Sequence, residues 1–174
     1  MKKLISVLTA LAIAAAAALT LSSCGKEPAE SDQTEPAQTQ LQAVSGEFTA
    51  ADILAKIKSE FTMDFETIEL YPDDMLDFYG IESEKIAELA GIQNACGYKD
   101  EIVIIKAVDE NAADEIEDIF EQHIEDQKKT MKNYDPEQYQ VLGSSIAEED
   151  GVWVALFVSE DQAAMLDVYN SFVK

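Results

Sequence analysis

The sequence contains no arginine, and its 12 basic residues are all lysines, against 35 acidic residues. The formal net charge is −23 at pH 7. Nucleic-acid binding needs a positively charged footprint, so this composition argues against DNA and RNA as partners. The lack of guanidinium groups also argues against planar, bidentate recognition of phosphate. An acidic surface keeps a protein soluble, or it attracts basic partners and cations such as Ca²⁺.

Histidine and cysteine are nearly absent: the chain has one histidine, His123, and two cysteines, Cys24 and Cys96. A zinc site needs several such ligands, so zinc is not expected. His123 falls beside the apolar stripe of an expected helix and fits the edge of a core. Cys96 has no histidine near it in the sequence and fits a structural residue better than a nucleophile. No nucleophile elbow and no glycine-rich phosphate loop occurs, and no cofactor is expected.

The first residues have the pattern of an export signal, with two lysines before an uncharged stretch over residues 4–21. An aliphatic residue, two small residues and a cysteine follow as a lipobox: Leu21, Ser22, Ser23 and Cys24. Small side chains suit a narrow peptidase site, and the Cys24 thiolate takes up a diacylglyceryl group. The segment resembles a bacterial lipoprotein signal peptide. An uncleaved membrane helix is the alternative, because about 18 apolar residues is near the lower limit for a span.

Three parts are therefore expected along the chain: a lipoprotein signal peptide over residues 1–23, a flexible acidic linker over 24–47, and one folded domain over 48–174. The linker has no aromatic residue and is rich in Glu, Gln, Thr, Ser, Pro and Ala, so it cannot bury enough apolar surface to fold. We expect the domain to face outside the cytoplasm at the cell membrane. Lipidated Cys24 would hold it there, because anionic headgroups repel an acidic surface.

Capping signals predict four helices in the folded part. Two capping boxes, Thr49 with Asp52 and Ser159 with Gln162, begin the first and the last of them. Pro72 is typical of the start of a short helix. The expected helices cover residues 50–61, residues 73–79, the segment between Asp109 or Asn111 and Asp135, and the segment after Ser159.

β-Branched and apolar runs predict the strands. "EIVIIKAV", residues 101–108, is the clearest; residues 86–93 fit a strand but also carry a helical pattern. Residues 138–147 and 152–158 are expected to form a hairpin with Glu148, Glu149 and Asp150 at its solvated tip. Paired strands separated by a helix predict a two-layer α+β domain, with an antiparallel sheet of about four strands and helices mainly on one face.

Several stretches together resemble a known family: "LDFYGIESEKIAE", "DEIVIIKAVD", "YDPEQYQVL" and "GVWVALFVSED". They are similar to bacterial lipoproteins catalogued as domain of unknown function 4358, from about Met75 to the C-terminus. The resemblance implies a lipid-anchored domain outside the cytoplasm. It implies no activity and supplies no catalytic residues.

Acidic and aromatic clusters supply the candidate sites. Asp73, Asp74 and Asp77 fit helix-start electrostatics, with a weak, non-standard Ca²⁺ site as the alternative; Met75 occupies a position where an EF-hand loop needs an acid. Trp153 fits a core position because "VWVALFV" is apolar on both faces. With Tyr98, Tyr134 and Tyr139, it could instead line a sugar- or peptide-binding face.

These features favour a membrane-tethered module that binds an envelope protein or a cell-wall component. Two alternatives stay open. One is an envelope-polymer hydrolase that uses Asp/Glu pairs. The other is a small-ligand or Ca²⁺-binding lipoprotein.

Overall fold

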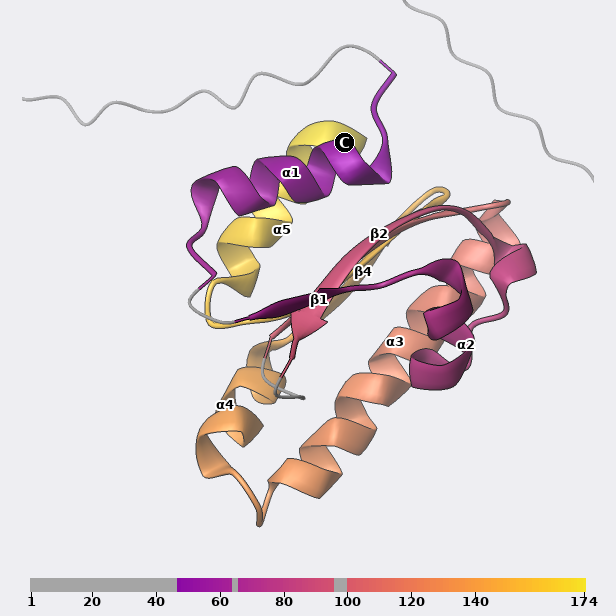
Figure 1. The fold of residues 1–174 in the computed structure, drawn as a ribbon. Coiled ribbons are helices and arrows are strands. Elements are labelled where there is room, and N and C mark those ends of the chain that lie inside the picture. Colours follow the sequence, from indigo (N-terminus) through magenta and orange to yellow (C-terminus); the bar gives the residue numbers. More distant parts are fainter. Residues whose placement is uncertain (1–46, 64–65, 96–99) are drawn as a thin grey trace, which may run out of the picture. The chain divides into compact units, whose positions relative to one another are not determined.

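The computed structural model describes residues 47–63, 66–95 and 100–174 (Figure 1). The expected signal peptide, with Cys24, lies outside the described residues, as do Cys96 and Tyr98. In chain order the elements are α1 (Ala50–Glu60), β1 (Thr67–Glu69), α2 (Pro72–Tyr79), the 3-10 turn η1 (Ser83–Lys85), β2 (Ile86–Asn94), β3 (Glu101–Ala107), α3 (Glu110–Met131), α4 (Pro136–Ser144), β4 (Ile146–Asp150), β5 (Trp153–Val158) and α5 (Gln162–Val173).

The five strands form one open sheet in the order β1-β2-β3-β5-β4, and every neighbouring pair is antiparallel. The predicted α+β class and the strand at residues 86–93 are confirmed. No predicted strand overlaps β1, which lies at one edge of the sheet, with β4 at the other. Three residues are too few to give β1 a recognisable alternating pattern in the sequence.

Helices cover both faces of this sheet rather than mainly one. Figure 1 shows α1 and α5 on one side of the strands and α2, α3 and α4 on the other. The reason lies in β3, where Val103 and Ile105 point into one buried cluster while Ile102 and Ile104 point into the other. A strand that is apolar at every position needs cover on both faces.

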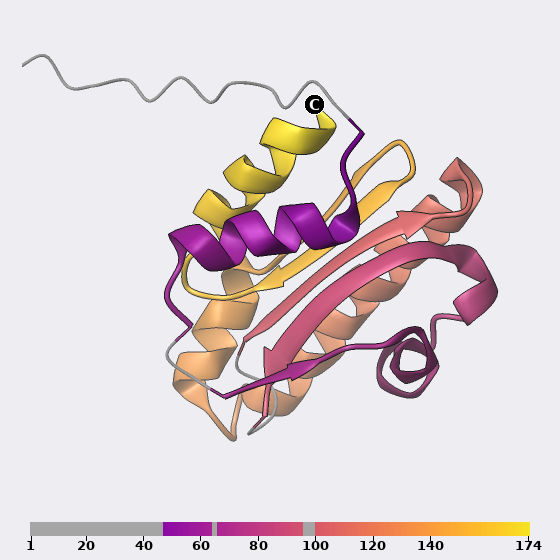
Figure 2. The ribbon, with the colours of Figure 1, turned by 45° about the horizontal axis from the view of Figure 1, so that its top comes forward.

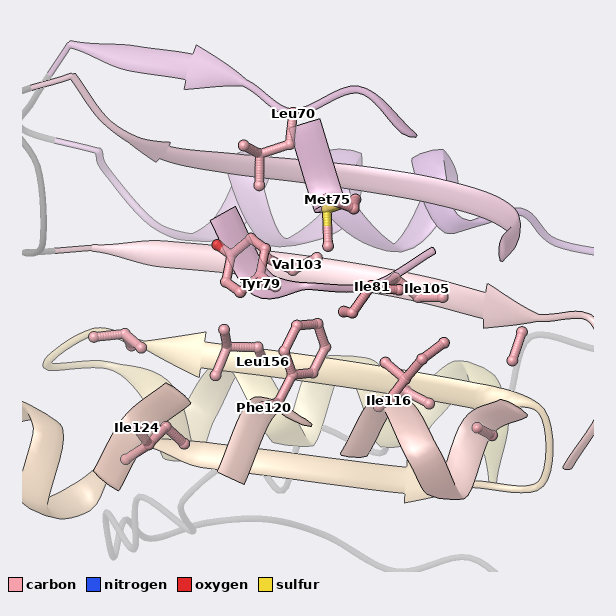
Figure 3. Close-up of a cluster of buried hydrophobic side chains, with 14 of the residues drawn as sticks. Leu70, Met75, Tyr79, Ile81, Val103, Ile105, Ile116, Phe120, Ile124 and Leu156 are labelled. Atoms are coloured by element: carbon pink, nitrogen blue, oxygen red, sulfur yellow. The ribbon is translucent and has the colours of Figure 1, made fainter. Parts of the chain in front are cut away.

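The α2–α3 face holds the larger of the two clusters (Figure 3). Met75 and Tyr79 point inward from α2, and Phe120 from α3 meets them beside Val103. The rings of Tyr79 and Phe120 contact each other edge to face, with centroids 5.5 Å apart. Helical spacing places these residues on one stripe of each helix.

Three of the four predicted helix starts are confirmed. The Thr49 hydroxyl accepts from the Asp52 N–H at 3.2 Å, and the Asp52 carboxylate accepts from the Thr49 N–H at 2.9 Å, which completes the capping box of α1. Pro72 begins α2. The Asp109 carboxylate caps α3 by accepting from the Ala112 N–H at 2.9 Å.

The strand predicted at residues 138–147 is wrong. Residues 136–144 form α4, whose first turn is capped by the Asp135 carboxylate, 3.0 Å from the Gln138 N–H. Glu148, Glu149 and Asp150 belong to β4 and not to a hairpin tip. The turn begins instead at Gly151, whose φ of 63° is the left-handed conformation that glycine adopts without strain.

The second predicted capping box is also wrong. α5 begins at Gln162 after Asp161, and no side chain caps it. The Ser159 hydroxyl accepts instead from the Asp161 N–H at 3.3 Å. Such a local bond, two residues along the chain, competes with helix capping and delays the start of the helix.

Candidate functional site

Exposed apolar side chains are concentrated in the segment that contains β1 and α2. Seven large hydrophobic residues are exposed in the described part of the chain, and four of them fall within residues 68–78. These four, 45–61% exposed, are Ile68, Tyr71, Leu76 and Phe78, and we call them the β1–α2 surface. Exposed apolar residues are ordinary when scattered, but a group of them indicates a contact site.

The local fold explains why these side chains stay outside. Met75 and Tyr79 take the inward stripe of the short helix α2, so Leu76 and Phe78 lie off that stripe. The Asp74 carboxylate accepts from the Tyr71 N–H at 2.8 Å and fixes the chain just before the helix. Leu70 is buried, and a Cβ on Gly91 of β2 would lie 3.0 Å from its side chain. This close approach holds β1 against β2.

A groove of about 360 Å³ opens beside the β1–α2 surface, between α1 and strands β1 and β2. Its lining is mostly apolar or small, and includes Leu54 and Ala55 of α1, Tyr71, and Ala90 and Gly91 of β2. Lys58 and Glu69 also line it. Such a lining suits apolar side chains of a ligand, with a charged group at the margin to orient them.

A second hollow shares Pro72 with the groove and has a volume of about 440 Å³. Leu76 lines it together with three carboxylates, those of Asp73, Glu82 and Glu84. The surroundings of the β1–α2 surface are therefore strongly acidic. Opposite charge on a partner would be attracted here.

The predicted cation candidates do not form a shared ligand set. Asp74 is engaged with the Tyr71 N–H, Asp73 lines the second hollow, and Asp77 is exposed on α2. Within residues 47–63, 66–95 and 100–174, no group of three or more His, Cys, Asp or Glu side chains is arranged to hold a metal ion.

A buried polar cluster joins three elements and was not foreseen from the sequence. The Glu101 carboxylate, at the start of β3, accepts from the Tyr79 hydroxyl of α2 at 3.2 Å. The Nε2 atom of His123, on α3, lies 3.0 Å from the same carboxylate oxygen. Burial, and then the charge and hydrogen bond of Glu101, raise the pKa of Tyr79 above its usual range.

The side chains of this cluster are buried, which indicates a structural role. Glu101 is only 5% exposed, and the Tyr79 ring packs against Phe120 and His123. The prediction that His123 sits at the edge of the core is confirmed, since its side chain is largely buried. Hydrogen bonds to a buried carboxylate are stronger than neutral ones, so the cluster ties α2, β3 and α3 together.

Crowded carboxylates lie where α3 meets the edge strand β4. Burial, followed by the charges of Asp114, Asp150 and Glu110, raises the pKa of Glu149. Burial and then the charge of Glu149 raise the pKa of Glu117. The backbone of Glu149 acts in the opposite direction and lowers the pKa of Glu117, whose carboxylate lies beside this edge strand.

The aromatic candidates that the structure describes, Trp153, Tyr134 and Tyr139, do not line a common face. Trp153 is buried in the α1–α5 cluster, as its sequence context predicts, and stacks on Phe48 with ring centroids 5.0 Å apart. Lys106 Nζ lies 5.3 Å from the Trp153 ring. Tyr139 lies on α4, across the sheet, and Tyr134 is exposed in the turn before that helix.

The elements and contacts above define an α+β domain with a five-stranded antiparallel open sheet. Residues 62–159 match the family described as Domain of unknown function (DUF4358), and the chain belongs to that family. The match takes in all five strands and α2, α3 and α4, while α1 and α5 lie beyond its bounds. No curated protein and no solved structure matches the chain significantly. None of the helices in the described ranges is both long and apolar enough to cross a bilayer.

Proposed function

We propose that this protein is a lipid-anchored binding module of the cell envelope, whose β1–α2 surface contacts another envelope component. The observation that carries the proposal is the concentration of exposed apolar side chains at residues 68–78, next to an apolar groove, on a strongly acidic chain. Apolar area of this kind is costly to expose unless a partner covers it.

The N-terminal sequence supports the envelope as its location. A lipobox ending at Cys24 follows an apolar stretch, and the segment that comes next is polar and has no aromatic residue. The lipid would place the domain at the membrane, and the polar segment would give it reach. Binding is favoured over hydrolysis because the raised-pKa carboxylates, Glu117 and Glu149, are packed against a strand edge rather than across a groove.

Site-specific photo-crosslinking in the protein's own membranes tests the proposal. A benzophenone side chain replaces Tyr71 in one variant and Leu76 in another, within the full chain. The matched control carries it at Tyr134, an exposed aromatic residue outside the β1–α2 surface. We expect the same crosslinked partner from Tyr71 and Leu76, and none from Tyr134. The proposal is wrong if the first two positions capture nothing reproducible, or if Tyr134 captures the same species.

A further inference from the structure

The outer edge of β1 has unused backbone hydrogen-bonding groups. The Leu70 N–H donates to the Gly91 carbonyl at 2.9 Å, and the Ala95 N–H donates to the Glu66 carbonyl at 2.8 Å. Antiparallel ladders alternate, so Ile68 also faces β2, opposite Gln93. Thr67 and Glu69 must then point their N–H and C=O groups away from the sheet. No described segment pairs with that edge, and Figure 2 shows β1 as the outermost strand on its side.

We infer that β1 accepts an extended, basic segment of a partner protein as a sixth strand. The inference rests on the proposed function and gives it a mode and a partner chemistry. The bound segment would exchange backbone hydrogen bonds with Thr67 and Glu69, as strand addition does at other open sheet edges. Only two β1 residues are available, so side-chain contacts must supply the rest of the affinity.

The groove beneath α1 supplies one set of those contacts. Successive side chains of a strand point to opposite faces, so alternate residues of the added strand would point to the α1 side. Glu69 lies on that side and lines the groove with Leu54 and Ala55. Ile68 and Leu70 lie on the other face, where Leu70 is buried and Ile68 is 45% exposed. Apolar side chains on either face of the segment would therefore find apolar surface.

Charge selects the basic segment. Glu69 lies on the edge itself, and Asp73, Glu82 and Glu84 line the hollow beyond Pro72. Lys85, which follows Glu84 in the chain, is paired with Glu115 at 2.6 Å and lies 3.9 Å from Glu82, and Lys58 is the one lysine in the lining of the groove. A segment with lysine or arginine between its apolar residues complements this surface, whereas an acidic segment would be repelled.

The opposite edge of the sheet is less available. Helix α3 packs along β4, and the Glu117 carboxylate lies beside the backbone of Glu149, where an added strand would have to approach. Glu148 of the same strand pairs with Lys174 at 2.6 Å. Blocking of this kind is how proteins protect an edge strand, and within the described chain it is present at β4 and not at β1.

Two variants of Thr67 test the inference at constant charge. Thr67→Pro removes an outward N–H without breaking the β1–β2 ladder, because proline is tolerated at the first residue of an edge strand. Thr67→Val keeps the N–H and the strand propensity. The probe is a fluorescent eight-residue peptide of alternating lysine and valine, and its control is the same peptide methylated at alternate backbone nitrogens. Binding to the full-length protein is followed by fluorescence anisotropy at about 0.15 M salt, where long-range charge attraction is screened.

We expect the unmethylated peptide to bind the wild type and Thr67→Val alike, and to lose about fivefold or more in affinity for Thr67→Pro. Amide hydrogen exchange in the wild type should slow at Thr67 and Glu69 when the peptide is added, and stay unchanged at Ile68. Circular dichroism confirms that each variant folds. Equal binding to both variants, equal binding of the methylated peptide, or no protection at Thr67 and Glu69 would overturn strand addition.

The photo-crosslinking experiment separates this inference from the proposed function. A membrane partner captured equally well in the Thr67→Pro and Thr67→Val backgrounds leaves the binding module intact and rejects the strand-addition mode. Capture in the Thr67→Val background alone supports both.

Discussion

Tyr79 and Tyr169 are two buried tyrosines that differ in the hydrogen bonding of their hydroxyl groups. The Tyr79 hydroxyl donates to Glu101, whereas the Tyr169 hydroxyl is buried with no hydrogen-bond partner in the described structure. Tyr79→Phe should therefore lower the free energy of unfolding by about 1–2 kcal/mol, and Tyr169→Phe should be neutral or stabilising by up to about 1 kcal/mol. Urea denaturation of both variants at pH 7 checks the signs. Equal losses in the two would contradict this assignment of the hydroxyls.

The raised pKa of Tyr79 adds a pH dependence to that experiment. The contribution of its neutral form is complete below the unfolded-state pKa of about 10 and is lost as pH rises above it. Wild-type stability should fall between about pH 10 and pH 11.5, and the Tyr79→Phe variant should fall less over the same window. If the stability of wild type and of Tyr79→Phe fell equally with pH, ionisation of Tyr79 would not contribute to the loss of stability above about pH 10.

Glu149 and Glu148 are neighbours on β4 that should respond oppositely to neutralisation. Glu149 is surrounded by like charges, which raise its pKa after burial; Glu148 is paired with Lys174. A carboxylate whose pKa is raised by folding destabilises the folded state when it is ionised. The protein is therefore more stable below the pKa of this group in the unfolded state, and it loses that stability as the pH rises. Glu149→Gln should therefore stabilise the protein at pH 7 by about 0.5 kcal/mol after allowance for solvent screening, and not at pH 3. Glu148→Gln should give no gain, and thermal melts at both pH values decide between them.

Sequence patterns predicted the setting of single residues in the buried polar cluster but not the cluster itself. Its members are Tyr79, Glu101 and His123. The lone histidine beside an apolar stripe was recognisable as a core-edge residue, and Glu101 was visible as an acid at the head of an apolar strand. Nothing in the sequence joined them, because the residues come from three elements whose packing order is not encoded in any local pattern. Proximity along the chain is equally uninformative for the cation candidates of α2, which within the described residues belong to no group of three or more possible metal ligands.

At the scale of elements, two glycines both have space for a side chain, but their backbones adopt different conformations. Gly80 ends α2 with a φ of 80°, whereas Gly143 lies within helix α4, and an added Cβ would meet nothing within 4 Å at either position. Gly80→Ala should cost about 1 kcal/mol because alanine is strained in the left-handed region. Gly143→Ala should stabilise by about 0.5–1 kcal/mol through helix propensity. Chemical denaturation of the two variants measures both effects, and a gain at Gly80 would contradict the cap.

Capping chemistry predicted elements better than composition did. Thr49, Pro72 and Asp109 marked helix starts that the structure confirms. Residues 138–147 were misassigned because their aromatic and β-branched content favours a strand, although Asp135 and Pro136 are an N-cap and a first helical residue. Asp135 and Pro136 were interpreted only as the end of the preceding helix, which ends earlier, at Met131, and their role as the start of α4 was missed.

The sequence indicates that helices cover both faces of the sheet. That pattern was used to place Trp153 in the core, but it was not applied to the sheet as a whole. "VWVALFV" and "EIVIIKAV" are nearly continuous apolar runs, which is the pattern of strands covered on both faces. A sheet with helices on one face would need alternation in its central strands. The same runs explain why β3 and β5 are the central strands, and why the open edge falls at the short, polar β1.

For the whole molecule, the acidic net charge determines what kind of membrane anchor the proposed location requires. Anionic headgroups would repel a chain of net charge −23, so the proposed membrane location needs an anchor other than the protein's own surface. Two acyl chains, at about 0.8 kcal/mol for each buried CH₂ group, are enough for stable attachment, whereas one chain is marginal. The proposed location therefore depends on a single atom, the Cys24 sulfur.

The two cysteines of the chain give a matched test of that dependence. Cells expressing wild type, Cys24→Ser or Cys96→Ser are fed an alkyne-bearing palmitate analogue, and the protein is purified, labelled and analysed by intact mass. Because the lipobox requires the cysteine at position 24 and makes no use of Cys96, label should appear in wild type and Cys96→Ser and be lost in Cys24→Ser. The mass of the labelled forms should correspond to a chain that starts at residue 24. A chain that keeps Met1 and carries no label would instead identify residues 4–21 as an uncleaved membrane helix, and the tether would then be polypeptide rather than lipid.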